Sequence, residues 1–184
     1  NTVCVFDHHR QTSEVIENVH NYRSELGILY LNDFNRKVMQ KIFAENELEF
    51  TELFQCDVYV YLGNNHPLAS KDKITFEELS DYPCLSFEQG DKNSFYFAEE
   101  VFSTLQYKQM IKADDRATML NLMVGMNGYT LCSGIICEEL NGDGYSAIPL
   151  DTDEKMTIGY IKRRGMHISH IGKNYIEILR SYAK

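Results

Sequence analysis

Residues 57–79 read DVYVYLGNNHPLASKDKITFEEL and contain a strand, a break and the start of a helix. The apolar run from Val58 to Gly63 predicts a strand. The pair His66-Pro67 ends it, because proline has no N–H and disfavours helix for the residue before it. Thr75 and Glu78 have the spacing of a capping box, which predicts a short helix beginning there. A strand that leaves its sheet just before a capped helix indicates a hinge between two domains.

The residues before this break alternate between strands and helices. The pattern predicts strands at 2–6, 27–31 and 48–62, the last as one strand or as two with a bend near Gln55, and helices at 13–23 and 35–43. The order β, α, β, α, β is typical of a parallel sheet covered by helices.

The residues after the break predict a second α/β unit. Helices are expected from Thr75 and at 94–105, 115–124 and 135–140, and strands at 82–87, 109–112, 129–133 and 145–148. A second polar crossing at 149–155 would return the chain to the first lobe, where a strand at 156–161 and a helix at 169–182 complete it. The predicted fold is therefore α/β, with two Rossmann-like lobes joined by two crossover strands. The first lobe comprises 1–62 and 155–184, and the second 63–154.

The composition limits the kind of function. The chain has 184 residues and a formal charge of −9, from 18 Lys and Arg against 27 Asp and Glu. Such a surface repels phosphate backbones, so any DNA-binding part is expected outside these residues. No apolar run approaches the roughly 20 residues of a membrane helix. The five cysteines form no Cys-x-x-Cys pair, which favours reduced thiols in a cytoplasmic protein.

Several short motifs occur in an order that resembles one family over nearly the whole chain. They are residues 12–16 (TSEVI), 25–29 (ELGIL), 66–69 (HPLA), 74–79, Tyr82-Pro83, 115–120 (DRATML), 125–130 (GMNGYT) and 133–135 (SGI). Together they resemble the effector-binding domain of LysR-type transcriptional regulators. This resemblance implies a type 2 periplasmic-binding-protein fold, a cytoplasmic homodimer or homotetramer, and no enzymatic activity.

The chain departs from the full family pattern at its amino terminus. The winged helix-turn-helix and linker helix are absent, and so are the first strand and helix of the effector domain, because Thr2 aligns with the second strand. We therefore interpret the sequence as a fragment. DNA would be bound only through the helix-turn-helix domain that this chain lacks.

The resemblance also implies effector contacts at strand ends and helix starts, in a cleft between the lobes. The predicted effector-binding residues are Thr12, Ser13, Tyr30, Asn32, Phe34, Ser86, Phe87, Glu88, Gln89, Arg116, Ala117 and Thr118. A helix start beside a cationic arginine attracts a carboxylate or phosphate, so an anionic effector is expected. The alternatives are helix capping at Thr12 and Ser13, packing of aromatic residues at the rim, an exposed turn at 86–90, and an ion pair between Arg116 and a neighbouring aspartate.

Metal, cofactor and catalytic motifs are not found. His167 and His170 lack a third ligand of matching placement, no Gly-x-Gly-x-x-Gly turn supports nucleotide binding, and Gly-x-Ser-x-Gly is absent. We therefore predict no metal, no cofactor and no catalytic residue.

The predicted function is that of a ligand-sensing regulatory domain. An effector in the cleft would change the lobe angle or the dimer packing and so reposition DNA-binding domains. The alternative is a solute-binding protein of a transporter with the same two-lobe fold, which would have an export signal upstream of Asn1. A weaker third possibility is an enzyme on this fold, such as a prephenate dehydratase-like lyase or a cofactor-bearing synthase.

Overall fold

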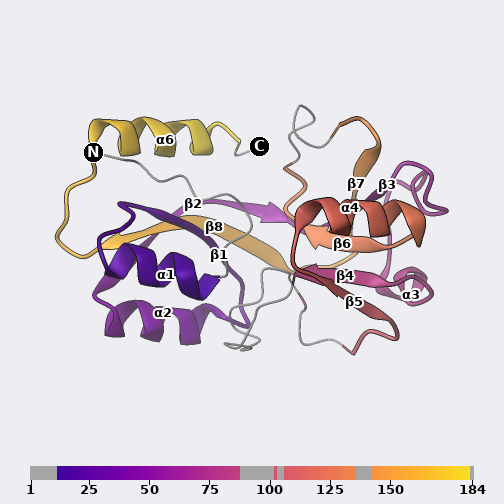
Figure 1. Ribbon diagram of the computed structural model, residues 1–184, viewed down its shortest axis with the longest axis horizontal. Coiled ribbons are helices and arrows are strands. Elements are labelled where there is room, and N and C mark those ends of the chain that lie inside the picture. The colour runs from indigo at the N-terminus through magenta and orange to yellow at the C-terminus, as the bar shows by residue number, and fades with distance from the viewer. Residues whose placement is uncertain (1–11, 88–101, 103–105, 136–141, 183–184) are drawn as a thin grey trace. The chain divides into compact units, whose positions relative to one another are not determined.

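The computed structural model describes residues 12–87, 102, 106–135 and 142–182 (Figure 1). These residues form two compact units, and the chain passes between them at Cys56–Asp57 and at Glu154–Lys155. Each unit has its own β-sheet together with helices, in agreement with the predicted α/β class. The predicted strand at 2–6 lies outside the described residues, as do the predicted helices at 94–105 and 135–140 apart from Phe102 and Ile135.

The described residues of unit 1 form a three-stranded sheet and three helices. The strands are β1 (Gly27–Leu31), β2 (Leu48–Asp57) and β8 (Lys155–Arg163), in the order β1-β8-β2, and the helices are α1 (Thr12–His20), α2 (Arg36–Glu45) and α6 (His170–Arg180). Helices α1 and α2 lie on one face of the sheet and α6 on the other (Figure 1). Strand β8, which returns from unit 2, pairs with β1 antiparallel, from Gly27 opposite Ile161 to Leu31 opposite Thr157. The parallel pattern expected from the order of the first elements did not include this strand.

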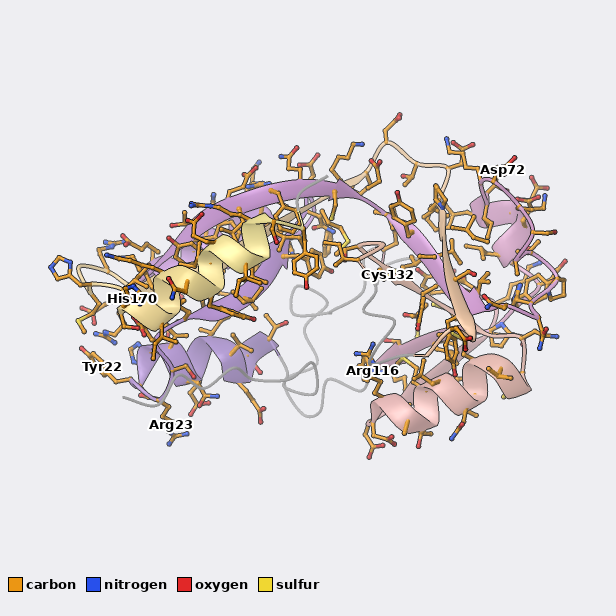
Figure 2. The ribbon with its side chains drawn as sticks, turned by 90° about the horizontal axis from the view of Figure 1, so that it is seen from above. Tyr22, Arg23, Asp72, Arg116, Cys132 and His170 are labelled. Atoms are coloured by element: carbon orange, nitrogen blue, oxygen red, sulfur yellow. The ribbon has the colours of Figure 1, made fainter. Side chains whose placement is uncertain are left out.

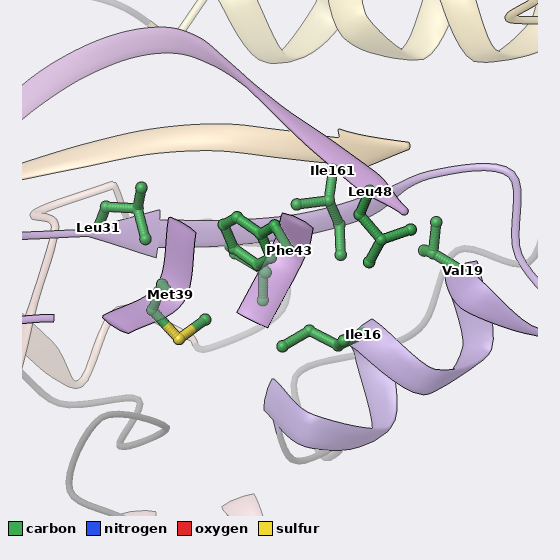
Figure 3. Packing of buried hydrophobic residues seen from close by; sticks show 8 residues of the cluster. Ile16, Val19, Leu31, Met39, Phe43, Leu48 and Ile161 are labelled. Atoms are coloured by element: carbon green, nitrogen blue, oxygen red, sulfur yellow. The ribbon is translucent and has the colours of Figure 1, made fainter. Parts of the chain in front are cut away.

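The core of unit 1 lies between the sheet and the helices α1 and α2 (Figure 3). Its buried residues are Ile16, Val19, Leu29, Leu31, Met39, Phe43, Leu48 and Ile161. Full burial of one such side chain stabilises a folded protein by about 1.5–3 kcal/mol. Ile16 and Val19 are three residues apart on α1, and Met39 and Phe43 are four apart on α2. This spacing gives each helix one apolar stripe toward the sheet.

Unit 2 contains a five-stranded sheet in the order β5-β4-β6-β3-β7. Its elements are β3 (Tyr59–Gly63), α3 (Phe76–Leu79), β4 (Cys84–Phe87), β5 (Met110–Ala113), α4 (Arg116–Gly125), β6 (Tyr129–Cys132) and β7 (Tyr145–Pro149). Strand β4 is parallel to β5 and β6, whereas β3 is antiparallel to β6 and β7. The sheet is therefore mixed. Its parallel strand β5 is followed by the turn that leads into α4.

The turn at His66-Pro67 lies inside unit 2 and is not the crossing that we predicted. His66 is buried; its Nδ1 accepts the N–H of Leu68 at 3.1 Å, and its Nε2 lies 3.0 Å from the carbonyl oxygen of Asn127. The crossing at Cys56–Asp57 lies before β3, because β3 pairs along its length with β6 and β7 of unit 2. The break was correctly predicted as a turn, but the domain boundary at 62–63 differs from the observed one.

The capping box at the start of α3 is confirmed. The hydroxyl of Thr75 accepts the N–H of Glu78, and the carboxylate of Glu78 accepts the N–H of Thr75 at 3.0 Å. Within the described part of the chain, no helix combines the length and apolar character needed to cross a membrane.

Candidate functional site

Two parallel strands of unit 2 end at one edge of its sheet. Phe87 at the end of β4 pairs with Ala113 at the end of β5, and α4 begins three residues after Ala113. The predicted residues Ser86 and Phe87 therefore reach the same edge as the first turn of α4. Both side chains are half-buried, and the Ser86 hydroxyl lies 3.4 Å from the carbonyl oxygen of Phe87. Glu88 and Gln89 lie outside the described residues.

The first turn of α4 holds the other predicted residues of this unit. Asp115 is the N-cap, and its carboxylate accepts the N–H of Thr118 at 2.8 Å. Arg116 is half-buried at the start of the helix (Figure 2), whereas Ala117 and Thr118 are exposed. The turn thus combines a cation with backbone N–H groups that point away from the helix, which is the arrangement that favours anions.

Tyr61 is a polar residue of this region that the sequence did not single out. Its side chain is 6% exposed, and its hydroxyl has no hydrogen-bond partner among the residues that the structure describes. Burial raises the pKa of Tyr61 to about 12, and the positive charge of Arg116 offsets part of that increase. The hydroxyl is therefore protonated at neutral pH. In the sequence, Tyr61 reads only as part of an apolar strand.

In unit 1, the predicted residues follow the carboxyl end of β1. Tyr30 is half-buried opposite Ile158 of β8, and Phe34 is 46% exposed. Asn32 is buried and reciprocally bonded to Asn35: each side-chain oxygen accepts the backbone N–H of the other residue at 2.9 Å. This pair fixes the turn between β1 and α2. The side-chain oxygen of Asn32 therefore has a structural role in this turn.

Arg36 is the second residue that the sequence analysis missed. It is the first residue of α2 and half-buried, and its Nη2 donates to Oγ1 of the buried Thr157 at 2.7 Å. Within the described residues its guanidinium forms no ion pair with a carboxylate. The sequence does show a cationic residue directly after the turn that follows β1. That no carboxylate pairs with it in the described residues can be seen only in the structure.

Thr12 and Ser13 lie in the first turn of α1. The helix begins at Thr12, with Thr12 half-buried and Ser13 buried. Both residues are therefore helical, and neither is the N-cap that the sequence predicted. Their hydroxyl groups remain at the amino end of the helix, where the sequence analysis placed effector contacts.

Histidine and cysteine side chains offer no multidentate metal site in the described ranges. There, no group of three or more His, Cys, Asp or Glu side chains is arranged to hold a metal ion. His167 and His170 are both exposed. Cys56, Cys84 and Cys132 form no disulfide with one another.

Comparisons with known proteins agree on one family. A family profile described as "LysR substrate binding domain" matches residues 8–184. The chain is 26% identical over 139 residues to the malolactic fermentation system transcriptional activator of Lactococcus lactis subsp. lactis (strain IL1403). That match covers 73% of this chain and 47% of the relative. The chain thus spans about half the length of the curated relative that it matches.

Solved structures with a similar fold include three regulator structures. The LysR family regulator HinK from Pseudomonas aeruginosa matches with a TM-score of 0.62 and 14% identity, over 94% of this chain and 57% of HinK. The oxidized form of OxyR gives 0.61 and 19%, over 94% and 78%. The effector binding domain of QuiR in complex with shikimate gives 0.60 and 19%, over 95% and 78%. At these identities the likeness shows the fold.

Proposed function

Because this chain belongs to the LysR substrate-binding domain family, we propose that it senses a small carboxylate effector for a transcriptional regulator. The family match covers residues 8–184 and supports a ligand-sensing regulatory domain over a transporter's solute-binding protein. The carboxylate is our addition. It rests on Arg36, a half-buried guanidinium without a carboxylate partner among the described residues of a chain whose charge is −9.

The contacts of Arg36 support a role in binding an anion. Removing a cation from water is costly unless a counter-charge is near. Arg163, a half-buried arginine in the same unit, pairs with Glu47, whereas the bond of Arg36 within the described part of the chain is to the neutral hydroxyl of Thr157. That bond uses one N–H and holds the planar group in place. The remaining N–H groups suit a carboxylate, which an arginine binds through two parallel hydrogen bonds.

Unit 2 also has a half-buried arginine at the start of a helix. Arg116 is the first residue of α4 and follows the N-cap Asp115, whose carboxylate accepts the N–H of Thr118. The proposed effector contacts are therefore the predicted residues of both units together with Arg36. The cleft predicted from the sequence stays part of this proposal.

Two of the relatives suggest which carboxylates to try first. QuiR was solved with shikimate, and the Lactococcus relative activates a malolactic fermentation system. Shikimate, L-malate and L-lactate all have a carboxylate and at least one hydroxyl. We include them as probes because Arg36 would bind the carboxylate while neutral polar groups bind a hydroxyl.

The proposal extends to the whole regulator. DNA would be bound through a helix-turn-helix domain outside these residues, since the chain is acidic, and the protein would act in the cytoplasm as a homodimer or homotetramer. The domain would have no catalytic activity of its own. Effector binding would favour one arrangement of the regulator over another, which requires a difference in affinity between the two.

Thermal unfolding with and without carboxylates tests the proposal. The purified protein is heated alone and with a panel that includes L-malate, L-lactate and shikimate, each also as its uncharged methyl ester. A true effector at a hundred times its dissociation constant stabilises the folded protein by about 2.7 kcal/mol. We expect at least one free acid to raise the unfolding temperature more than its ester. Equal shifts for acid and ester, or none across the panel, would reject the carboxylate effector.

A further inference from the structure

Helix α6 has apolar side chains on two of its sides. One side is buried and includes Ile176. The other side is a row that we call the α6 stripe, in which intervals of four, three and four residues place the side chains in line along a helix. Its members are Ile171, which is 56% exposed, Tyr175, which is half-buried, Ile178, which is 57% exposed, and Tyr182, which is 50% exposed.

The stripe continues past the last residue of α6. Tyr182 stays in line because its N–H still donates to the carbonyl oxygen of Leu179 at 3.1 Å. Single exposed apolar residues are ordinary on a protein surface, but a contiguous row of large ones marks a surface that binds another molecule.

The α6 stripe carries no charge. Asn174 and Ser181 border it, and the residues of α6 that are charged at neutral pH project from the opposite side of the helix. Two of these, Glu177 and Arg180, form an ion pair with each other at 2.7 Å. The stripe therefore does not attract DNA, an anionic membrane surface or a highly charged protein. An apolar, uncharged protein surface fits it.

The position of the stripe on the helix favours another helix as that surface. Among the described residues, α6 is the one helix on its face of the unit 1 sheet, whereas α1 and α2 share the other face (Figure 1). Helical geometry turns the stripe about a quarter turn away from the buried side of α6. The stripe therefore faces sideways along the sheet, and a helix that packs on it would lie beside α6.

A second copy of this chain supplies a matching helix. When two stripes run antiparallel across a two-fold axis, Ile171 faces Tyr182 of the second copy and Tyr175 faces Ile178. Each contact then joins an aliphatic side chain to an aromatic ring. The uncharged stripe also suits two copies that have a formal charge of −9 each, because no like charges are brought into direct contact.

We propose that the α6 stripe is a self-association surface, through which two copies of this chain pair their α6 helices antiparallel. This inference deepens the proposed function, because it rests on the homodimer or homotetramer proposed there and names a surface for it. It does not depend on the identity of the effector. The contact spans about three helical turns of each copy, so we expect a weak dimer.

Sedimentation velocity of the purified protein at about 1–300 μM measures this association. The wild type should change from monomer to dimer as its concentration rises. Ile178→Gln should raise the dissociation constant about tenfold or more, because it removes an apolar side chain from the contact in both copies. Val124→Gln is the matched control, since Val124 is an aliphatic residue of α4 that is 53% exposed and lies outside the stripe.

Both replaced side chains are exposed, so both variants should keep the circular dichroism spectrum of the wild type. Val124→Gln should associate as strongly as the wild type. An equal loss of association in both variants would mean that general surface hydrophobicity, and not the stripe, brings the copies together, and it would overturn the inference.

A double-mutant cycle tests the antiparallel direction. Ile171→Gln and Tyr182→Gln change side chains that meet across the two-fold axis. The loss of association in the double variant should therefore be smaller than the sum of the two single losses, because residues in contact are coupled. Additive losses would overturn the antiparallel contact.

Failure of this inference differs from failure of the proposed function. A wild type that stays monomeric over the whole range, or an Ile178→Gln variant that associates as strongly as the wild type, would overturn self-association through the stripe. Neither result affects the carboxylate effector, which thermal unfolding with the probes tests separately. A protein that responds to no carboxylate but dimerises through α6 would reject the effector and leave this inference standing.

Discussion

Arg36 donates through Nη2 to Oγ1 of Thr157 at 2.7 Å and so joins the start of α2 to the strand that returns from unit 2. The acceptor is 2% exposed and lies opposite Leu31, the last residue of β1. The guanidinium is therefore held at the end of β1, next to the turn that contains Asn32 and Phe34. Its fixed orientation distinguishes it from the exposed cations of the same helix.

Replacing Arg36 by glutamine should weaken carboxylate binding about tenfold, because two charge-assisted hydrogen bonds are lost. Arg36→Lys should retain only part of the affinity, since an ammonium group cannot form the paired bonds of a guanidinium. Isothermal titration with the probe that best stabilises the wild type measures both. Lys37→Gln removes the same charge from the next, exposed residue. An equal loss of affinity in Lys37→Gln would mean that the net charge of the protein, and not a direct contact by Arg36, determines carboxylate binding.

Protonation of His66 should make the protein less stable in mild acid. Its Nδ1 accepts from Leu68, so the neutral ring has its proton on Nε2 and donates to the Asn127 carbonyl. Burial lowers the pKa of His66 below 6.5. The unfolded chain then binds the proton more readily, so the stability due to the neutral ring is complete above about pH 6.5. It is lost as the pH falls below that value.

Urea unfolding at pH 7.5 and pH 5.0 measures this effect. His66→Asn should be less stable than the wild type at pH 7.5 but should lose less further stability at pH 5.0. The exposed His170 provides the control, and His170→Asn should follow the wild type at both values. The same acid-induced loss in all three proteins would show that His66 is not the group that titrates.

The sequence predicted most local structure because local patterns determine it. The strand at 27–31 has the predicted bounds, since it is an apolar run followed by a polar turn, and the predicted capping box of Thr75 and Glu78 begins α3. The direction of β8 against β1 could not be predicted in this way. Strand pairing depends on which residues meet in space, and a similar apolar run fits either direction.

The site was only partly predictable for the same reason. Residues at strand ends and helix starts follow from the order of elements, which placed Ser86 and Arg116 at one edge of a sheet. Within the described structure, the Tyr61 hydroxyl has no hydrogen-bond partner and the Arg36 guanidinium has no carboxylate partner. These two features draw attention to both residues. Whether a side chain has a partner depends on the folded structure and cannot be predicted from the residue pattern alone.

Removal of the cap at Thr75 should destabilise unit 2. In Thr75→Ala the N–H of Glu78 loses its acceptor, which costs about 1 kcal/mol for a typical N-cap. Thr75→Ser keeps the hydroxyl and should retain most of the stability. Urea unfolding of both variants provides the comparison. The capping interpretation would fail if the serine variant were as unstable as the alanine variant.

A methyl group at Gly27 should disrupt the contact between α1 and β1. A Cβ there would lie 2.6 Å from Cγ1 of Val15 and 3.0 Å from Cγ1 of Ile161, so the helix and strand must move apart. Overpacking of this kind costs about 1–3 kcal/mol. Gly125, the last residue of α4, has open space at the same position, and Gly125→Ala should be neutral or slightly stabilising because alanine favours helix. Thermal unfolding of the two variants shows whether the loss of stability comes from tight packing at Gly27 or from replacing any glycine by alanine. Equal stability of Gly27→Ala and the wild type would show that α1 is free to shift on the sheet.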